Sequence, residues 1–94
     1  MTQPLDERSR VTLSPSVYAR AFGAELVLLD FGKGEYFGLD AIGAEIWRRL
    51  EAGDDLGAAA DHLVVRYEVR REDVLGDIVD LVAQLRSYDL VLPP

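Results

Sequence analysis

The sequence contains no cysteine and only one histidine, His62. Without cysteine the chain has no disulfide, no thiolate metal ligand and no cysteine nucleophile. A single histidine does not complete a zinc site, because such sites are built mainly from several cysteine and histidine ligands. We therefore interpret His62 as a structural side chain and expect neither a metal nor any other cofactor.

Catalytic motifs are missing as well. No serine lies in a G-x-S-x-G context. Gly32, Gly34 and Gly38 have the spacing of neither a P-loop nor a dinucleotide fingerprint, and a turn plus a crowded strand position explains them better. The carboxylate pair Asp54-Asp55 stands where a helix is expected to start, so capping is its simpler role. These absences predict a protein that is not an enzyme.

Long apolar runs and an excess of positive charge are also absent. The longest apolar run, Leu26–Leu29, is far too short to span a bilayer, and residues 1–10 contain no apolar signal core. The net charge is −7 and the pI is about 4.5. Such a charge disfavours nucleic acids and anionic membranes and suits a basic or neutral partner. We expect a cytoplasmic protein that binds neither membrane nor nucleic acid.

What the chain does contain is enough apolar material for one core. It has 94 residues, of which 49% are hydrophobic, and it shows no repeat, linker or low-complexity tract. This length leaves no room for two cores, and this hydrophobic content disfavours disorder. We expect residues 1–10 to form a disordered tail and residues 11–92 to form a single domain.

The first half of the chain predicts strands. Residues 25–30 and 35–39 are rich in strand formers, and Phe31-Gly32-Lys33-Gly34 between them suits a turn, which predicts a β-hairpin. Residues 11–13 form a short strand candidate that residues 17–22 continue. Residues 90–92 could add a short strand near the C-terminus.

The second half predicts three helices. Asp40 caps the first and Gly53 ends it, Asp54 or Asp55 caps the second, and the third starts near Arg71 with a poor cap. Strands followed by helices favour one α+β domain. The specific expectation is a winged helix-turn-helix-like fold, in which an N-terminal three-stranded antiparallel sheet precedes three helices.

The third predicted helix has an acidic stripe formed by Asp73, Asp77, Asp80 and Gln84. Two interpretations stay open: the stripe is a solvated face, or it borders a groove. Winged-helix folds often bind DNA, and the arginines at 48, 49, 66, 70 and 71 are the only basic clusters. An acidic helix, however, would be repelled from the major groove of a polyanion.

The ordered motifs of the chain resemble one known family. Residues 34–47 contain a glycine turn, an aromatic strand, Leu39-Asp40 and a small-residue helix that reaches Ile46-Trp47. Tyr67-Glu68-Val69, Asp77-Ile78 and Leu90-Val91 follow at matching places. Together these motifs resemble the PqqD family of peptide-recognition proteins over about residues 11–92. Within it, the chain looks most like the free-standing leader-binding proteins of lasso-peptide biosynthesis. Gly38 departs from relatives, which often carry a larger polar residue.

The resemblance implies a non-catalytic function. In this family a precursor-peptide leader adds as a strand to the free edge of the third strand, in the cleft beside the third helix. A separate leader protease and a macrolactam-forming cyclase would then receive the peptide. Carried over to this chain, the peptide-binding residues would be Glu35, Tyr36, Phe37, Gly38, Leu39, Asp73, Val74, Asp77, Ile78 and Leu81.

Three alternatives stay open at this point. Leu75 and Val79 would form the helix wall if the third helix faced the other way. A PqqD-type peptide chaperone for a radical enzyme would share the fold and the binding mode but act on another precursor peptide. A winged-helix DNA-binding regulator is the alternative from a different class of function.

Overall fold

Turns and capped helix starts divide residues 4–92, the part of the chain described by the computed structural model, into eight elements. They are β1 (Thr12–Leu13), β2 (Val17–Phe22), β3 (Glu25–Asp30), β4 (Glu35–Leu39), α1 (Ala41–Glu51), α2 (Leu56–Tyr67), α3 (Arg71–Ser87) and β5 (Val91–Leu92). The expected α+β organisation, with a three-stranded antiparallel sheet followed by three helices, is confirmed.

The main sheet has the strand order β2-β3-β4, and both of its pairings are antiparallel. The turn between β3 and β4 is fixed by the Asp30 carboxylate, which accepts a hydrogen bond from the Gly32 backbone N–H at 3.0 Å. Gly34 adopts a φ of 69°, which favours glycine. The predicted hairpin is therefore confirmed. Among residues 4–92, no strand pairs with the outer side of β4, so β4 is a free sheet edge.

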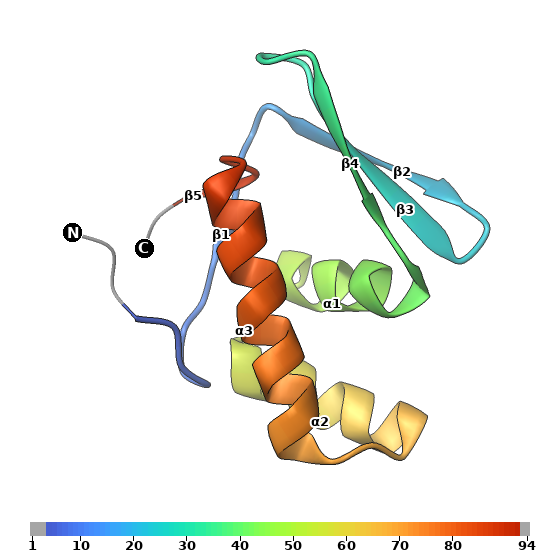
Figure 1. Ribbon diagram of the computed structural model, residues 1–94, viewed down its shortest axis with the longest axis vertical. Helices are drawn as coiled ribbons and strands as arrows, with labels where there is room; N and C mark the ends of the chain where they lie inside the picture. Colours follow the sequence, from blue (N-terminus) through green and yellow to red (C-terminus); the bar gives the residue numbers. More distant parts are fainter. Residues whose placement is uncertain (1–3, 93–94) are drawn as a thin grey trace.

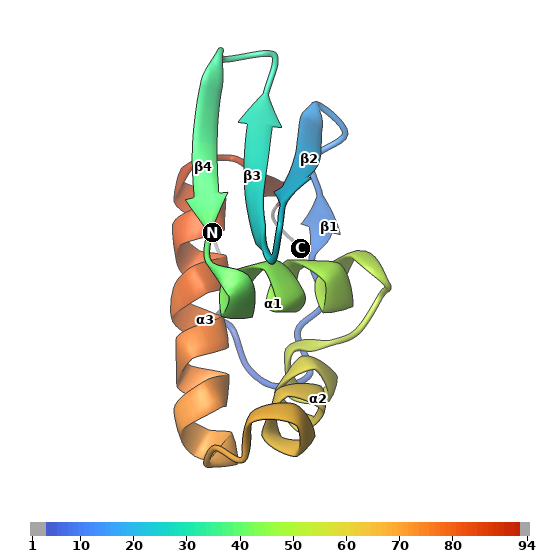
Figure 2. The same ribbon diagram turned by 90° about the vertical axis from the view of Figure 1, so that its right-hand side faces the viewer.

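The two faces of the sheet differ in burial. Leu26 and Leu28 of β3 are buried, whereas Val27 and Leu29, which alternate with them, are only partly buried. In Figure 1 the helices lie on one side of the sheet, and Figure 2 shows β4 at the sheet edge nearest α3 and β2 at the far edge. The free edge of β4 therefore lies near α3.

β1 is not the beginning of β2. It forms a second antiparallel pair with β5, in which Leu13 lies opposite Val91. A turn separates it from β2, where the Val17 N–H donates to the Ser14 carbonyl at 3.2 Å. The expected continuation of residues 11–13 into 17–22 is corrected by this turn, and the expected short C-terminal strand is confirmed as β5.

The helices start where the sequence predicts. The Asp40 carboxylate accepts a hydrogen bond from the Gly43 N–H at 2.8 Å, and Asp55 accepts one from the Ala58 N–H at 2.7 Å. Such caps satisfy N–H groups that lack a partner within the helix. Arg70 precedes α3 and contributes no side-chain cap hydrogen bond. The predicted poor cap is therefore confirmed.

The core lies between the sheet and the helices. Its largest fully buried side chains are Leu28, Leu56, Leu63, Ile78, Val82, Leu85 and Val91. These residues come from the sheet, from α2, from α3 and from β5. The core therefore holds the sheet of the first half of the chain against the helices and the last strand. None of the helices in the described residues has the length and apolar character needed to cross a bilayer.

The segment before β1 contacts α2. The Leu56 N–H donates to the Ser9 carbonyl at 3.0 Å, and the Gly57 N–H donates to the Glu7 carbonyl at 2.8 Å. The partly buried Leu5 packs against the core. Residues 1–3 lie outside the described residues, and the disordered tail over residues 1–10 stays a prediction. The backbone carbonyls of Glu7 and Ser9 satisfy N–H groups at the start of α2, a contact that no side-chain pattern reveals.

Candidate functional site

An open groove of about 490 Å³ lies where β4, α1 and α3 meet. Its lining residues are Phe37, Gly38, Leu39, Asp40, Ile42, Gly43, Ile46, Asp77, Leu81 and Gln84. The β4 residues bring the free sheet edge into the groove, because no described strand covers that edge. Unpaired strand edges offer rows of backbone donors and acceptors to another chain. The groove thus combines an open backbone edge with apolar side chains.

The side of α3 that faces the groove carries Asp77, Leu81 and Gln84. These positions are four and three residues apart, so they share one helix face. Leu75 lies instead on another part of the surface, beside Arg70, Arg71 and Glu72. Leu75 and Val79, which form the alternative helix wall, do not line this groove, and the side of α3 that meets a peptide stays a prediction.

Five of the ten residues expected to bind peptide line this groove: Phe37, Gly38, Leu39, Asp77 and Leu81. Glu35 and Tyr36 belong to the same strand and are exposed. The remaining three, all on α3, do not line it. Asp73 is exposed one turn away, Val74 packs against the core, and Ile78 is 0% exposed. Ile78 therefore supports the wall from behind, because its side chain faces the core.

Sequence reasoning missed the contribution of α1. Asp40, Ile42, Gly43 and Ile46 form one end of the groove, and Gln84 extends the α3 wall. Ile42 lies on the apolar stripe of α1 with the buried Ile46 and Leu50, yet it is 46% exposed. Ile42 therefore adds exposed apolar surface to the groove. The sequence alone could not separate Ile42 from the core positions of the same stripe.

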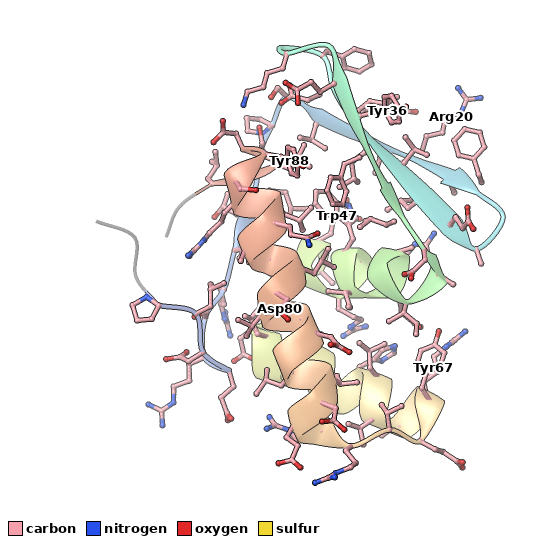
Figure 3. The ribbon with its side chains drawn as sticks, viewed as in Figure 1. Arg20, Tyr36, Trp47, Tyr67, Asp80 and Tyr88 are labelled. Carbon is pink, nitrogen blue, oxygen red and sulfur yellow. The ribbon has the colours of Figure 1, made fainter. Side chains whose placement is uncertain are left out.

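Two contacts join the β3–β4 hairpin to the C-terminal end of α3. The rings of Phe37 and Tyr88 lie with their centroids 5.3 Å apart. Lys33, in the turn, forms an ion pair with Asp89 just after the helix. The hydrogen bond that the Lys33 ammonium donates to the Asp89 carboxylate raises the pKa of Lys33. Figure 3 shows Tyr88 at the end of α3 that lies beside the sheet. These contacts set how far β4 lies from α3, and so they set the width of the groove.

The groove is acidic. Its charged lining residues are Asp40 and Asp77, and Asp73 and Asp80 are exposed on the same helix as Asp77. No lysine or arginine is among the lining residues. Within residues 4–92, no group of three or more histidine, cysteine, aspartate or glutamate side chains could hold a metal ion. The arrangement therefore suits an extended chain with apolar and basic side chains.

A separate polar cluster joins α1 to α2. The Glu45 carboxylate accepts a hydrogen bond from the Tyr67 hydroxyl at 2.7 Å and lies 3.1 Å from the Arg66 guanidinium and 3.4 Å from His62. Burial by itself raises the pKa of Glu45, but the hydrogen bonds from Tyr67 and His62 and the charge of Arg66 outweigh it and lower the pKa. His62 thus lies in a contact between helices, outside the groove.

Comparison with known proteins agrees with this geometry. The family described as coenzyme PQQ synthesis protein D (PqqD) matches residues 25–91, which include β4, all three helices and the whole groove. The chain belongs to the PqqD family. No functionally curated protein matches the chain.

Two solved structures are similar over nearly the whole chain. One, described as TbiB1 in complex with the TbiA(beta) leader peptide, is 35% identical, covers 85% of this chain and 93% of that chain, and has a TM-score of 0.81. The other, described as lasso peptide synthetase B1 complexed with the leader peptide, is 34% identical, covers 90% of this chain and 100% of that chain, and has a TM-score of 0.84.

Proposed function

We propose that this chain binds the leader segment of a precursor peptide in lasso-peptide biosynthesis. The observation that carries the proposal is the free edge of β4 beside an acidic, partly apolar groove. Two proteins that share the fold at about one-third identity are described as complexes with leader peptides. The leader would lie along Glu35–Leu39 as a fourth strand of the sheet.

Strand addition divides the binding free energy between two kinds of contact. Hydrogen bonds from the main chain of β4 hold any extended peptide and fix its register, so they contribute affinity with little dependence on sequence. Side chains of the peptide that point into the groove meet Ile42, Leu81 and Asp77. These contacts select apolar residues and a basic residue or a hydrogen-bond donor at defined positions of the leader.

We further propose that the bound peptide passes to other proteins for its chemistry. The described residues contain no cluster that could hold a metal, and the groove has no histidine, cysteine, serine or lysine among its lining residues. A protein that only binds the leader requires separate enzymes, and a leader protease and a macrolactam-forming cyclase are the expected recipients. We assign this handover to the cytoplasm.

The family itself favours a second candidate. Because its description is that of a coenzyme PQQ synthesis protein, the same fold and groove would also suit a PqqD-type peptide chaperone for a radical enzyme. That function uses the same free edge and differs only in the precursor and in the enzyme that follows. The precursor peptides and enzymes encoded next to this gene separate the two candidates directly.

Binding and its location are tested together. A fluorescein-labelled synthetic peptide, with the leader sequence of the precursor encoded beside this gene, is titrated with the purified chain. A peptide of the same composition in scrambled order is the control. We expect one-to-one saturable binding of the leader only. Amide hydrogen exchange of the complex should show new protection at Glu35–Leu39.

Two results would overturn the proposal. The absence of any difference between the leader and the scrambled peptide would exclude specific leader recognition. New protection confined to residues outside β4 would show that the peptide binds somewhere else, and that strand addition to this edge is wrong.

A further inference from the structure

Nothing in the structure of the free protein requires a glycine at position 38. It lies in the interior of β4, and its φ is not among the positive values that favour glycine. A Cβ atom placed on it would meet no described atom within 4 Å, so the expected crowding at this strand position is wrong. Glycine weakens a strand, because it adds backbone entropy to the unfolded chain and contributes no side-chain contact. A glycine that neither a turn nor crowding explains marks a place where a ligand approaches closely.

Two nearby glycines, Gly34 and Gly43, have structural explanations that Gly38 lacks. Gly34, in the turn before β4, needs its positive φ of 69°. Gly43, at the start of α1, lies in a tight place, because a Cβ there would lie 3.2 Å from the Asp40 carboxylate. Gly38 has room and an ordinary backbone, so only its lack of a side chain distinguishes it.

The space over Gly38 belongs to the face of the sheet opposite the helices. Successive strand residues point to opposite faces, so Gly38 shares its face with Tyr36, while Phe37 and Leu39 point toward the core. Gly38 pairs with Val27, which pairs in turn with Arg20 of β2. Figure 3 shows Tyr36 and Arg20 on the side of the sheet away from the helices. The missing side chain of Gly38 leaves an open position at the β4 edge of this face, next to Val27 and Tyr36, and we call this position the notch.

The notch is bordered by side chains that a ligand would cover. Val27 is only partly buried, since Gly38 offers no side chain on that side. Tyr36, on the edge strand β4, is 78% exposed. Neither feature stabilises the free protein, because apolar surface left in water contributes nothing to folding.

We propose that the leader carries a large aromatic side chain opposite Gly38, and that this ring fills the notch against Val27 and Tyr36. The inference rests on the proposed strand addition, which places one peptide residue beside Gly38 and points its side chain to the same face. A ring lying across a cross-strand glycine replaces the contacts that the glycine lacks. Leader recognition then uses both faces of the added strand: the groove on one side and the notch on the other.

An aromatic residue fits the notch better than a long polar one. The border consists of a β-branched side chain and a ring, and aromatic residues pair favourably with both types across strands. A flat ring covers the exposed glycine backbone while its edge remains in water. A lysine or glutamate there would leave Val27 uncovered.

The test places a side chain at position 38, so that the protein itself occupies the notch. Gly38→Val puts a β-branched side chain into a strand position that has space for it, so we expect the variant to fold with a Tm at or above that of the parent. The same change should weaken binding of the labelled leader roughly tenfold or more, because the ring and the valine compete for one volume. Gly38→Ala should weaken binding by a smaller factor.

A matched control and a peptide series make the result specific. Gly76→Ala adds a Cβ in equally open space on α3, outside the groove lining, and should leave leader binding unchanged. In an alanine scan of the leader, one large aromatic residue should lose its importance when the protein carries Gly38→Val. That non-additive pair would identify the residue that occupies the notch.

The possible failures can be told apart. If the parent chain does not bind the leader at all, the proposed function itself is wrong. If the parent binds, with protection at β4, and Gly38→Val binds equally well, the notch is empty in the complex and this inference alone is overturned. Additive effects of Gly38→Val with every leader substitution would also overturn it. Should Gly38→Val fail to fold, Gly38→Ala with the same peptide series decides the matter in the same way.

Discussion

At the scale of single residues, Asp77 is the acidic side chain of α3 that lines the groove, and Asp80 on the same helix does not. We predict that Asp77→Arg keeps the fold, because an exposed helix position tolerates arginine. Loss of a partly exposed ion pair and the added repulsion each amount to about 1 kcal/mol, so leader affinity should fall on the order of tenfold. Fluorescence anisotropy measures the change.

Asp80→Arg is the matched control for this prediction. It changes the net charge of the chain by the same amount on the same helix, but at a position outside the groove lining. We expect it to affect leader affinity much less than Asp77→Arg. The difference should shrink at high salt, since salt screens exposed charges. Equal losses in both variants would mean that only overall charge matters and that Asp77 makes no local contact with the leader.

The Glu45 cluster gives a second prediction for single residues, this time on stability. Tyr67→Phe removes the hydroxyl that donates to Glu45, which should lower the free energy of unfolding by about 1 kcal/mol at pH 7. The pKa of Glu45 in the folded chain lies below its ordinary value of 4.5. The ionised carboxylate therefore adds to the free energy of unfolding at pH values above its ordinary pKa. This contribution is lost as the pH falls through the lower pKa of Glu45 in the folded chain.

The loss of stability caused by Tyr67→Phe should accordingly be largest at neutral pH. It should shrink as the pH falls through the lowered pKa of Glu45 and the carboxylate becomes protonated. Urea unfolding followed by the fluorescence of Trp47, the only tryptophan, measures it at each pH. A deficit that stays constant from pH 7 into the acid range would show that the hydroxyl acts on stability without the carboxylate charge.

At the scale of elements, the sequence predicts what depends on local chemistry. The β3–β4 hairpin follows from glycines between two runs of strand formers, and Asp40 and Asp55 cap helices as expected. The orientation of α3 could not be predicted, because an apolar arc wider than one contact allows several rotations about the helix axis. Packing of Ile78 into the core fixes that rotation and brings Asp77 to the groove.

Glycines in helices give a prediction at the same scale. Alanine normally stabilises a helix relative to glycine by up to about 1 kcal/mol. Gly76 on α3 has open space around it, so Gly76→Ala should raise the free energy of unfolding by an amount of this size. At Gly57 on α2, a Cβ would lie 3.0 Å from the Glu7 carbonyl oxygen. Gly57→Ala should therefore show no gain, or a loss.

Hydrogen exchange at residue 57 gives a second, local measurement for Gly57→Ala. The Gly57 N–H donates to that same Glu7 carbonyl, so displacement of the segment before β1 should speed hydrogen exchange of residue 57. Urea unfolding compares the free energies of both variants with that of the parent. Equal stabilisation by Gly57→Ala and Gly76→Ala would show that the segment gives way at no cost and does not help to hold α2.

At the scale of the whole molecule, the groove is assembled from parts that lie far apart in the sequence. β4 and the start of α1 form one side, and residues 77, 81 and 84 of α3 form the other, about half a chain away. The contacts of the hairpin with Tyr88 and Asp89 close this arrangement. The core, which joins the sheet to α2, α3 and β5, holds both sides in place. A binding site of this kind exists only in the folded chain, which is why sequence patterns located its β4 side better than its α1 and α3 sides.

The whole-molecule charge gives the last prediction, which separates leader binding from DNA binding. The chain carries a net charge of −7, and the exposed face of α3 contributes Asp73, Asp77 and Asp80. Duplex DNA binding depends on neutralising phosphates with basic residues, so this surface repels a duplex. We expect no mobility shift of duplex DNA at micromolar protein and physiological salt. Leader binding under the same conditions should persist and tighten as the salt concentration falls, if a basic residue of the leader meets Asp77. A sequence-specific DNA complex that survives physiological salt would instead favour the winged-helix regulator.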